Sequence, residues 1–253
     1  HLQIYTDTAG TVVIISNTAN AWLGNTSLNG LGVVRVGSAG VFPDGGGTVS
    51  LASSVLLDLN GYVETLAGLS GYGRVDNQQA GSSATVSVGA NHAATSFTGA
   101  FTNSGSGATL AVAKVGNGTL TLSGVSGHDG ATTVQAGALR VTSVAALGST
   151  ASGTSVDSGA ALELQGSITI TNESLVLNGT GVSSAGALRN ISGNNTWQGP
   201  IQLNNSAALT IASDSGELKL KGTITQTGGV PPTFQGGGHI FIDGGMNGGF
   251  TRG

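Results

Sequence analysis

The sequence lacks cysteine altogether and is poor in charged residues, aromatic residues and proline. The absence of cysteine excludes a disulfide framework and a zinc site built on thiolates. Only 8% of the 253 residues are charged, against about 25% in an ordinary domain, and the net charge is −4. The eight Lys and Arg residues are spread singly along the chain. This distribution argues against nucleic acid as a partner.

Long hydrophobic runs are also missing. The longest apolar stretches, such as Val12-Val-Ile-Ile15, fall far short of the roughly 18 residues that a membrane-spanning helix needs. The sequence therefore predicts no membrane span in this chain. No signal peptide is visible, and the first residue is His1 rather than Met, which favours a processed protein or an excerpt of a longer one.

Glycine is abundant, with 45 residues, and it separates short segments in which apolar and polar residues alternate. The clearest segments are Gly118-Thr-Leu-Thr-Leu122 and Gly137-Ala-Leu-Arg-Val141. Neighbouring side chains of a strand point to opposite faces, so Leu120 is predicted to face inward while Thr121 faces solvent. Glycine and β-branched residues interrupt every stretch with helical spacing, so no ordinary helix is expected.

The same unit, a small or polar residue followed by an alternating Leu or Ile, recurs about every ten or twenty residues. Further copies are Ala108–Val112, Ala160–Leu164, Glu173–Leu177, Gly186–Asn190, Ala207–Ile211, Gly216–Leu220 and Gly238–Ile242. This spacing suits a solenoid whose turns each carry two or three strands. With about 22 residues per turn, we expect an all-β parallel β-helix of about ten to twelve coils that forms one domain.

Corners between these strands are marked by glycine next to Asn or Asp, as in Asn60-Gly61, Asn117-Gly118 and Asn178-Gly179. Glycine supplies the positive φ angles that tight corners need. Asn residues that recur at corners are also predicted to stack as hydrogen-bonded ladders, provided that successive coils are in register.

Between about Asn60 and Gly222 the sequence resembles the autotransporter-associated β-strand repeat of bacterial surface proteins. The matching phrases are Leu57–Gly61 with Leu66–Gly71, then Lys114–Gly124, Thr132–Val141 and Ala187–Ile201. The resemblance implies a right-handed parallel β-helix, secretion, and a place outside the bacterial cell or on its surface. Passengers with this repeat are mostly stalks, adhesins or scaffolds, and the repeat implies no catalytic residues and no cofactor.

Residues 1–16 do not match the repeat and read as two strands around a turn. They are expected to be either a cap folded over the first coil or a strand donated to the next subunit. The solenoid is then predicted to occupy residues 17–243, and residues 244–253 a glycine-rich tail. The apolar residues of the first segment are candidate self-assembly positions: Leu2, Ile4, Tyr5, Val12, Val13, Ile14 and Ile15. End-to-end stacking through an open edge is a contact that need not close, so it would give a fibre.

An enzyme is the alternative, because parallel β-helices also form polysaccharide lyases and glycoside hydrolases, and hydrolases need two carboxyl groups roughly 5 to 10 Å apart. The twelve acidic residues form no tight local pair. Glu163 and Glu217 have similar offsets in their repeat units and would align if they shared a face, but solvated outward positions are expected for both. Arg140 and Arg189 have matching positions that favour an exposed charge ladder.

The histidines and the glycine-aspartate clusters are the remaining candidates for a catalytic or a calcium site. His128-Asp129 in the turn Ser126–Gly130 is expected to be an ordinary exposed turn rather than a catalytic base. The turns Pro43–Gly47 and Ile242–Gly245 each occur once, whereas calcium-binding turns come in consecutive copies. The sequence therefore predicts no metal and no cofactor.

The few aromatic residues, among them Trp22, Tyr62, Tyr72 and Trp197, are expected to fill corners of the interior; exposed ones would instead stack on sugar rings. The function expected from the sequence is a non-enzymatic extracellular stalk, adhesin segment or fibre subunit. Its expected partners are further copies of itself, a host or biofilm surface, and glycans.

Overall fold

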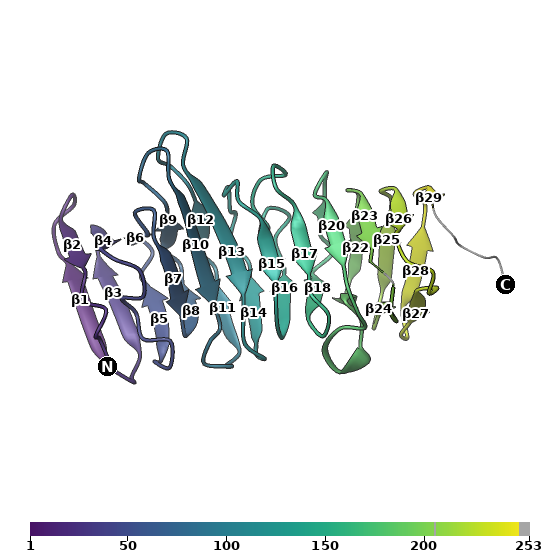
Figure 1. Ribbon diagram of the computed structural model, residues 1–253, viewed down its shortest axis with the longest axis horizontal. Helices are drawn as coiled ribbons and strands as arrows, with labels where there is room; N and C mark the ends of the chain where they lie inside the picture. Colours follow the sequence, from purple (N-terminus) through teal and green to yellow (C-terminus); the bar gives the residue numbers. More distant parts are fainter. Residues whose placement is uncertain (205, 248–253) are drawn as a thin grey trace.

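The computed structural model describes residues 1–204 and 206–247, which form a β-solenoid of parallel strands. Its coils stack side by side along the long axis, from the N-terminus to the C-terminus (Figure 1). The 29 strands are joined by turns, and the described residues contain no α-helix, only the 3₁₀ turn η1 (Val182–Ser184). The predicted parallel β-helix is confirmed.

Sheet A holds one strand from every coil and has eleven strands in chain order, which sets the number of coils within the predicted range. Each strand pairs in parallel with the equivalent strand of the next coil. Its strands are β1 (Leu2–Thr6), β3 (Thr26–Gly30), β5 (Thr48–Leu51), β8 (Gly68–Gly71), β11 (Thr95–Phe97), β14 (Thr119–Leu122), β16 (Ala138–Val141), β18 (Ala161–Gln165), β21 (Leu188–Ser192), β24 (Thr210–Ser213) and β27 (Thr233–Gln235).

The second strand position of the coils is occupied by two shorter sheets, one near each end of the rod, with a gap between them. Sheet B consists of β2 (Val12–Ile15), β4 (Val33–Val36), β6 (Leu56–Asp58), β9 (Arg74–Asp76) and β12 (Ala100–Thr102). Sheet D consists of β19 (Thr169–Ile170), β22 (Asn194–Trp197), β25 (Glu217–Leu220) and β28 (His239–Ile242). In the two coils between them, residues 123–131 and 142–153 cross this position without a strand.

Sheet C, the third position, begins two coils later than sheet A and has nine strands. They are β7 (Val63–Leu66), β10 (Ser83–Val88), β13 (Thr109–Lys114), β15 (Thr132–Val134), β17 (Thr154–Val156), β20 (Leu175–Leu177), β23 (Ile201–Leu203), β26 (Ile224–Gln226) and β29 (Met246–Asn247).

The interior consists of columns of aliphatic side chains, because register places like residues above one another. One column of sheet A holds Leu120, Leu139, Leu162, Leu188 and Ile211, all fully or almost fully buried. The residues that follow the four leucines on the outward side are polar or charged, namely Thr121, Arg140, Glu163 and Arg189. The alternation read from the sequence therefore builds a continuous core along the rod.

Corners require glycine where successive coils approach most closely. Gly99 lies two residues after the end of β11 and stacks on Gly73 of the preceding coil. A Cβ atom at Gly99 would lie 1.9 Å from the carbonyl oxygen of Gly73. The predicted Asn ladder is confirmed at Asn178, whose Oδ1 accepts a hydrogen bond from Asn204 Nδ2 at 3.1 Å. Thr227 Oγ1 in turn donates to Asn204 Oδ1 at 3.1 Å.

Both ends of the described chain continue the stack. Residues 1–16 form the first coil, where β1 pairs with β3 and β2 pairs with β4, both in parallel. At the other end, Met246–Asn247 of the expected tail forms β29 and pairs with β26, while residues 248–253 of that tail lie outside the described residues. Within the described residues, no helix is long and apolar enough to cross a membrane.

Candidate functional sites

The candidate self-assembly residues lie on the first coil, at the end of the stack. Leu2, Ile4, Val13 and Ile15 alternate with outward residues and remain partly accessible, since no other coil of the described chain covers them. The remaining three are exposed and point outward: Tyr5, Val12 and Ile14. The seven residues therefore divide into an inward row and an outward row, and all belong to strands whose far edge is unpaired among the described residues.

The opposite end of the described stack is also apolar. Phe234 on β27, Phe241 on β28 and Met246 on β29 are each about 40% exposed. Ile240 and Ile242 pack against the end of the core but are only partly covered. The two ends thus present apolar residues together with open strand edges.

Sheet A carries a ladder of alternating charge on its outward side. The Arg140 guanidinium donates to Glu163 at 2.7 Å, and Arg189 lies 3.6 Å from the other oxygen of Glu163 and 2.6 Å from Asp214. Charge-assisted bonds of this kind fix the spacing of neighbouring coils. The predicted charge ladder through Arg140 and Arg189 is confirmed.

The alternative in which Glu163 and Glu217 align on one face does not hold. Glu163 lies on β18 of sheet A, whereas Glu217 lies on β25 of sheet D and pairs with Lys219 at 2.9 Å. Glu163 is also not a solvated position, since its two arginine partners cover it and it is 4% exposed. A similar offset within the repeat does not determine which sheet a residue joins.

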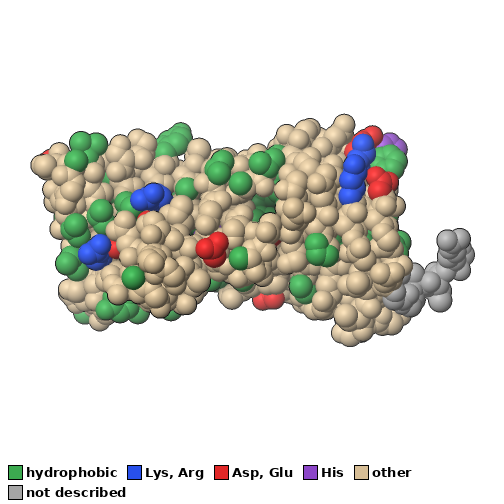
Figure 2. All heavy atoms as spheres, turned by 90° about the horizontal axis from the view of Figure 1, so that it is seen from above, with side chains coloured by type: hydrophobic (Ala, Val, Ile, Leu, Met, Phe, Trp, Pro, Cys, Tyr) green, Lys and Arg blue, Asp and Glu red, His purple; other side chains and the backbone are tan. Residues whose placement is uncertain are grey.

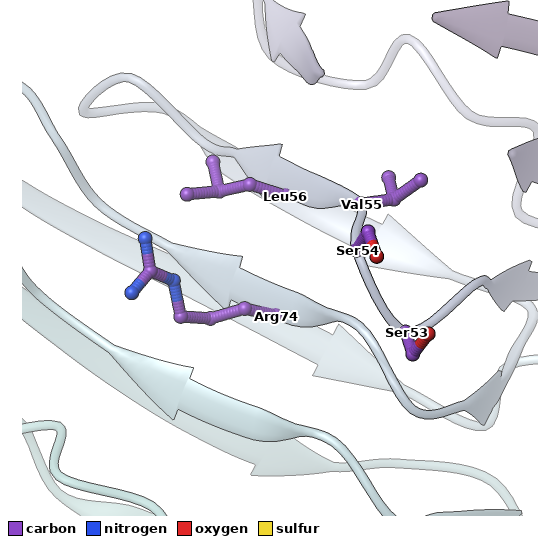
Figure 3. A pocket seen from close by; sticks show the side chains of 5 residues that line it. All are labelled: Ser53, Ser54, Val55, Leu56 and Arg74. Carbon is purple, nitrogen blue, oxygen red and sulfur yellow. The ribbon is translucent and has the colours of Figure 1, made fainter. Parts of the chain in front are cut away.

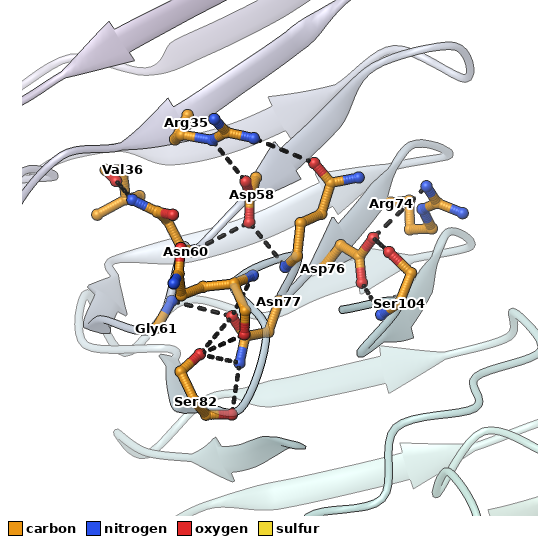
Figure 4. A network of polar contacts seen from close by, with 12 residues as sticks. Arg35, Val36, Asp58, Asn60, Gly61, Arg74, Asp76, Asn77, Ser82 and Ser104 are labelled. Carbon is orange, nitrogen blue, oxygen red and sulfur yellow. Dashed lines mark hydrogen bonds and ion pairs between the residues drawn. The ribbon is translucent and has the colours of Figure 1, made fainter. Parts of the chain in front are cut away.

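A second polar network joins sheet B to the corner that follows it (Figure 4). Asp58 and Asp76 are register partners in adjacent coils and are both fully buried. Asp58 accepts from Arg35 Nε at 2.7 Å and from the backbone N–H groups of Asn60 and Gln78.

The Asp76 carboxylate is held by one residue of the next coil. Its two oxygens accept from the backbone N–H and the hydroxyl of Ser104, at 2.8 and 2.6 Å. Asp58 and Asp76 are thus stacked carboxylates, and their oxygens accept the hydrogen bonds that hold the corners. They act as structural acceptors here.

His128 is buried, contrary to the expected exposed turn. Its Nε2 lies 3.0 Å from the hydroxyl of Thr132, and that hydroxyl donates to the Leu147 carbonyl, which places the imidazole proton on Nε2. The ring packs edge-on against Phe101, and Nδ1 is buried with no hydrogen-bond partner among the described residues. Burial lowers the pKa of His128 to about 4, against the opposing effects of Asp129 and the Phe101 backbone.

The burial of His128 follows from the gap between sheets B and D. In residues 123–131, which form no strand, Ser126 and His128 are buried while Val125 is 70% exposed. Ser126 bridges the coils on either side, since its hydroxyl accepts from Phe101 N and its own N–H donates to Ala145 O at 2.8 Å. Individual hydrogen bonds replace a strand ladder at this place.

Lys114, in the phrase that resembles the repeat family, is also buried. Its ammonium group donates to three backbone carbonyls, those of Val115 and Gly116 at 2.7 Å and that of Ala136 at 3.0 Å. All three of its protons are therefore used, and two successive coils are joined at this corner. Burial lowers the pKa of Lys114 to about 8.

Two further carboxyl groups are buried for similar reasons. Glu64 on the first strand of sheet C accepts from the N–H groups of Val41 and Phe42, each at 3.0 Å, in the coil that lacks a sheet C strand. Glu173 accepts from the hydroxyl of Thr154 at 2.7 Å. Burial raises the pKa of both carboxyl groups, although these hydrogen bonds act against it.

The aromatic residues singled out in the sequence lie at separate places along the rod. Trp197 is fully buried as expected, and Trp22 packs edge-on against Phe42. Tyr62 and Tyr72 are exposed, at 36% and 68%, so the burial expected for aromatic residues is wrong for both tyrosines. Among the described residues, no three His, Asp or Glu side chains gather in a group suited to a metal ion.

Comparisons with known proteins agree with this architecture. Residues 112–141, which include Lys114 and His128, match the passenger-associated transport repeat. The chain is 33% identical over 229 residues to the adhesin BmaC autotransporter of Brucella suis biovar 1 (strain 1330); the similarity covers 85% of this chain and 6% of that relative. No solved structure matches the chain.

The similarity to the adhesin extends well beyond the matched repeat. The chain lies outside the bacterial cell or on its surface. Residues 112–141 match a passenger-associated transport repeat, and most of the chain is similar to a small part of one autotransporter adhesin.

Proposed function

We propose that this chain is a non-enzymatic, adhesive and load-bearing segment of a bacterial surface protein. The single observation that supports this proposal is the unbroken sheet A, in which eleven strands stack in parallel register over one continuous core. A solenoid of this kind holds its side faces at fixed spacing along a rod and so presents an extended contact surface. The name of the relative, an adhesin, points the same way.

The character of the surface also supports adhesion through many weak contacts. One face of the rod carries few charged side chains (Figure 2). Uncharged polar residues and backbone atoms dominate it, with scattered apolar side chains. Such a face is suited to hydrogen bonding with host or biofilm surfaces, including their glycans, which are the partners that we propose.

The alternative is a polysaccharide lyase or glycoside hydrolase of the β-helix type. The state of the buried carboxylates favours the non-enzymatic role, because Asp58, Asp76 and Glu163 already accept hydrogen bonds from neighbouring coils. A carboxylate that acts as a general acid or nucleophile must reach the substrate instead.

A bead assay tests the adhesive role. Microspheres coated with the purified chain are expected to adhere to epithelial cells and to biofilm matrix, whereas spheres coated with the core variant Leu162→Asp, which buries an unpaired charge, are expected to detach. Equal retention of the two would contradict the proposal. Release of reducing ends or unsaturated sugars from a polysaccharide panel, abolished by Asp58→Asn, would favour the enzyme.

Head-to-tail assembly is a second proposed function, supported by the two apolar ends. An incoming copy would place the partly exposed Ile240 and Ile242 of one chain over Val13 and Ile15 of the next. Parallel strand addition at such an edge supplies backbone hydrogen bonds as well as apolar contact.

Electron microscopy over a range of concentrations tests this assembly. Unbranched fibres that disappear on deletion of residues 1–16, and on the milder change Ile15→Lys, are the expected result. The control Thr121→Lys introduces the same positive charge on the outward side of a strand far from both ends. It should leave the fibres intact. Single short rods at every concentration would contradict assembly and leave the adhesive role standing.

A further inference from the structure

A hollow opens on the side of the rod where a long turn meets a short one. Its volume is about 260 Å³, and it is lined by Ser53, Ser54, Val55, Leu56 and Arg74 (Figure 3). The serines belong to the turn that enters β6, whereas Arg74 begins β9 in the next coil.

The hollow arises from a difference in turn length between these two coils. Residues 52–55 form the longer turn, in which Val55 N donates to Ala52 O. The next coil makes the same crossing directly, because Tyr72 N and Gly73 N both donate to Leu51 O. The long turn therefore projects beside the short one and forms a ledge.

Glycine makes the short crossing possible. A Cβ atom at Gly73 would lie 2.6 Å from the carbonyl oxygens of both Ala52 and Val55. The ledge is thus built into the backbone of the fold rather than formed by mobile side chains.

Arg74 differs from the other arginines of the described chain. Arg35, Arg140 and Arg189 each donate a hydrogen bond to a carboxylate at 3.1 Å or less. Arg74 makes only a 3.5 Å contact with Asp76, and its side chain is the most exposed of the four, at 45%. Because Asp76 is already held by Ser104, the Arg74 guanidinium remains available to an external anion.

The other groups around the hollow suit a sugar ring. Leu56, which is 9% exposed, supplies a small apolar surface, while Val55 belongs to the core beneath it. The hydroxyls of Ser53 and Ser54 supply donors and acceptors at the rim. Tyr72, in the adjoining short turn, is 68% exposed, and an exposed aromatic ring can stack on the C–H face of a sugar. No acidic side chain lines the hollow.

We propose that this ledge binds a carboxylate-bearing sugar, such as a uronic or sialic acid residue of an acidic polysaccharide. Arg74 pairs with the carboxylate through its planar fork, a geometry that guanidinium and carboxylate share. The serines bond to sugar hydroxyls, and Tyr72 covers one ring face. The volume of about 260 Å³ lies just below the range of about 300 to 1,000 Å³ for ordinary ligand pockets, which favours a single ring over a long oligosaccharide. The proposal rests on the adhesive role proposed above and gives that role a chemical target.

Calorimetric titration at low salt tests the site with two matched pairs of probes. These are trigalacturonate against its methyl ester, and sialyllactose against lactose. We expect at least one acid of the two pairs to bind and its neutral counterpart to bind at least about tenfold more weakly, as for the loss of a charge-assisted hydrogen bond. Which acid binds identifies the source of the carboxylate.

Variants then assign the binding to Arg74. Arg74→Ala and Arg74→Lys should both weaken acid binding, the second because ammonium lacks the fork, while Lys221→Ala removes the same charge from an exposed position far along the rod and should have no effect. Unchanged thermal unfolding would show that the variants fold. Equal binding of acid and neutral probes, an unaffected Arg74→Ala, or no binding of either acid would overturn the proposal. Adhesion of coated beads is measured separately, so the ledge can fail while the adhesive role stands.

Discussion

Sheet A and the face shared by sheets B and D differ in how they hold the coils together. Sheet A runs through all eleven coils as one backbone ladder, whereas the other face is interrupted between β12 and β19. Across that interruption, individual contacts of Ser126, His128 and Thr132 replace the ladder. A regular ladder depends little on which side chains it carries, while the interrupted region depends on a few polar groups and on their protonation.

The largest effect should come from the core beneath sheet A. Leu162 is fully buried between Leu139 and Leu188 in the aliphatic column, so Leu162→Ala should lower the free energy of unfolding by about 2 to 5 kcal/mol. Denaturant unfolding followed by circular dichroism measures this. Leu23→Ala, at a highly exposed leucine, is the matched control. A loss of less than about 1 kcal/mol at Leu162 would show that the column is not closely packed.

The next effect concerns His128 and pH. Its folded pKa of about 4 lies below the ordinary value of 6.5, so the unfolded chain binds more protons between these values. Stability should therefore fall as the pH drops from 6.5 to 4, by on the order of 3 kcal/mol for this group.

Comparison of variants isolates that contribution, because the raised pKa values of Glu64 and Glu173 act in the opposite direction. The difference between the native chain and His128→Leu should change with pH across this window in thermal melts. His92→Gln, at an exposed histidine, should keep the acid dependence of the native chain. An identical pH profile for His128→Leu and the native chain would be inconsistent with a buried neutral imidazole.

Lys114→Met should have an effect of intermediate size. The variant leaves the carbonyls of Val115, Gly116 and Ala136 without their donor, which should cost about 1 to 3 kcal/mol. Because the folded pKa of about 8 lies below the ordinary 10.5, stability of the native chain should rise as the pH increases between these values, and the variant should lose that rise. Chemical denaturation at pH 7 and pH 9.5 measures both. Lys221→Met is the control, and equal losses at the two lysines would refute the buried role.

The smallest effect should come from the charge ladder on sheet A. Glu163→Gln removes the charge shared by Arg140 and Arg189 and should cost about 1 kcal/mol, less at high salt. Glu217→Gln, at a partly exposed pair with Lys219, should have a smaller effect. Urea midpoints at two salt concentrations measure the difference. Equal effects of the two variants would mean that the ladder adds nothing beyond a surface pair.

The strands and their inward residues were predictable because alternation is a local property. Leu120 and Leu139 follow polar residues in short segments between glycines, and the structure stacks them as predicted. The charge ladder was predictable for the same reason, since Arg140 and Arg189 occupy the same place after an inward leucine.

Properties that depend on neighbouring coils were not predictable. The turn that holds His128 looks exposed, and its burial depends on the missing strand between β12 and β19, for which the sequence has no local signal. Lys114 looks like a solvated charge at a strand end. A signal was available, however, because a lysine followed by Val-Gly-Asn-Gly precedes a corner whose backbone carbonyls can accept its protons.

Hydrogen exchange resolved by peptide, at pH 7 and pH 5 and corrected for intrinsic rates, tests the central claim most directly. The account predicts slow exchange in β14, β16 and β18 at both values, and faster exchange in residues 123–131 and 142–153 that increases at the lower pH. Uniform protection of both faces at both pH values would contradict the division between a continuous backbone ladder and an interruption held by individual backbone and side-chain hydrogen bonds.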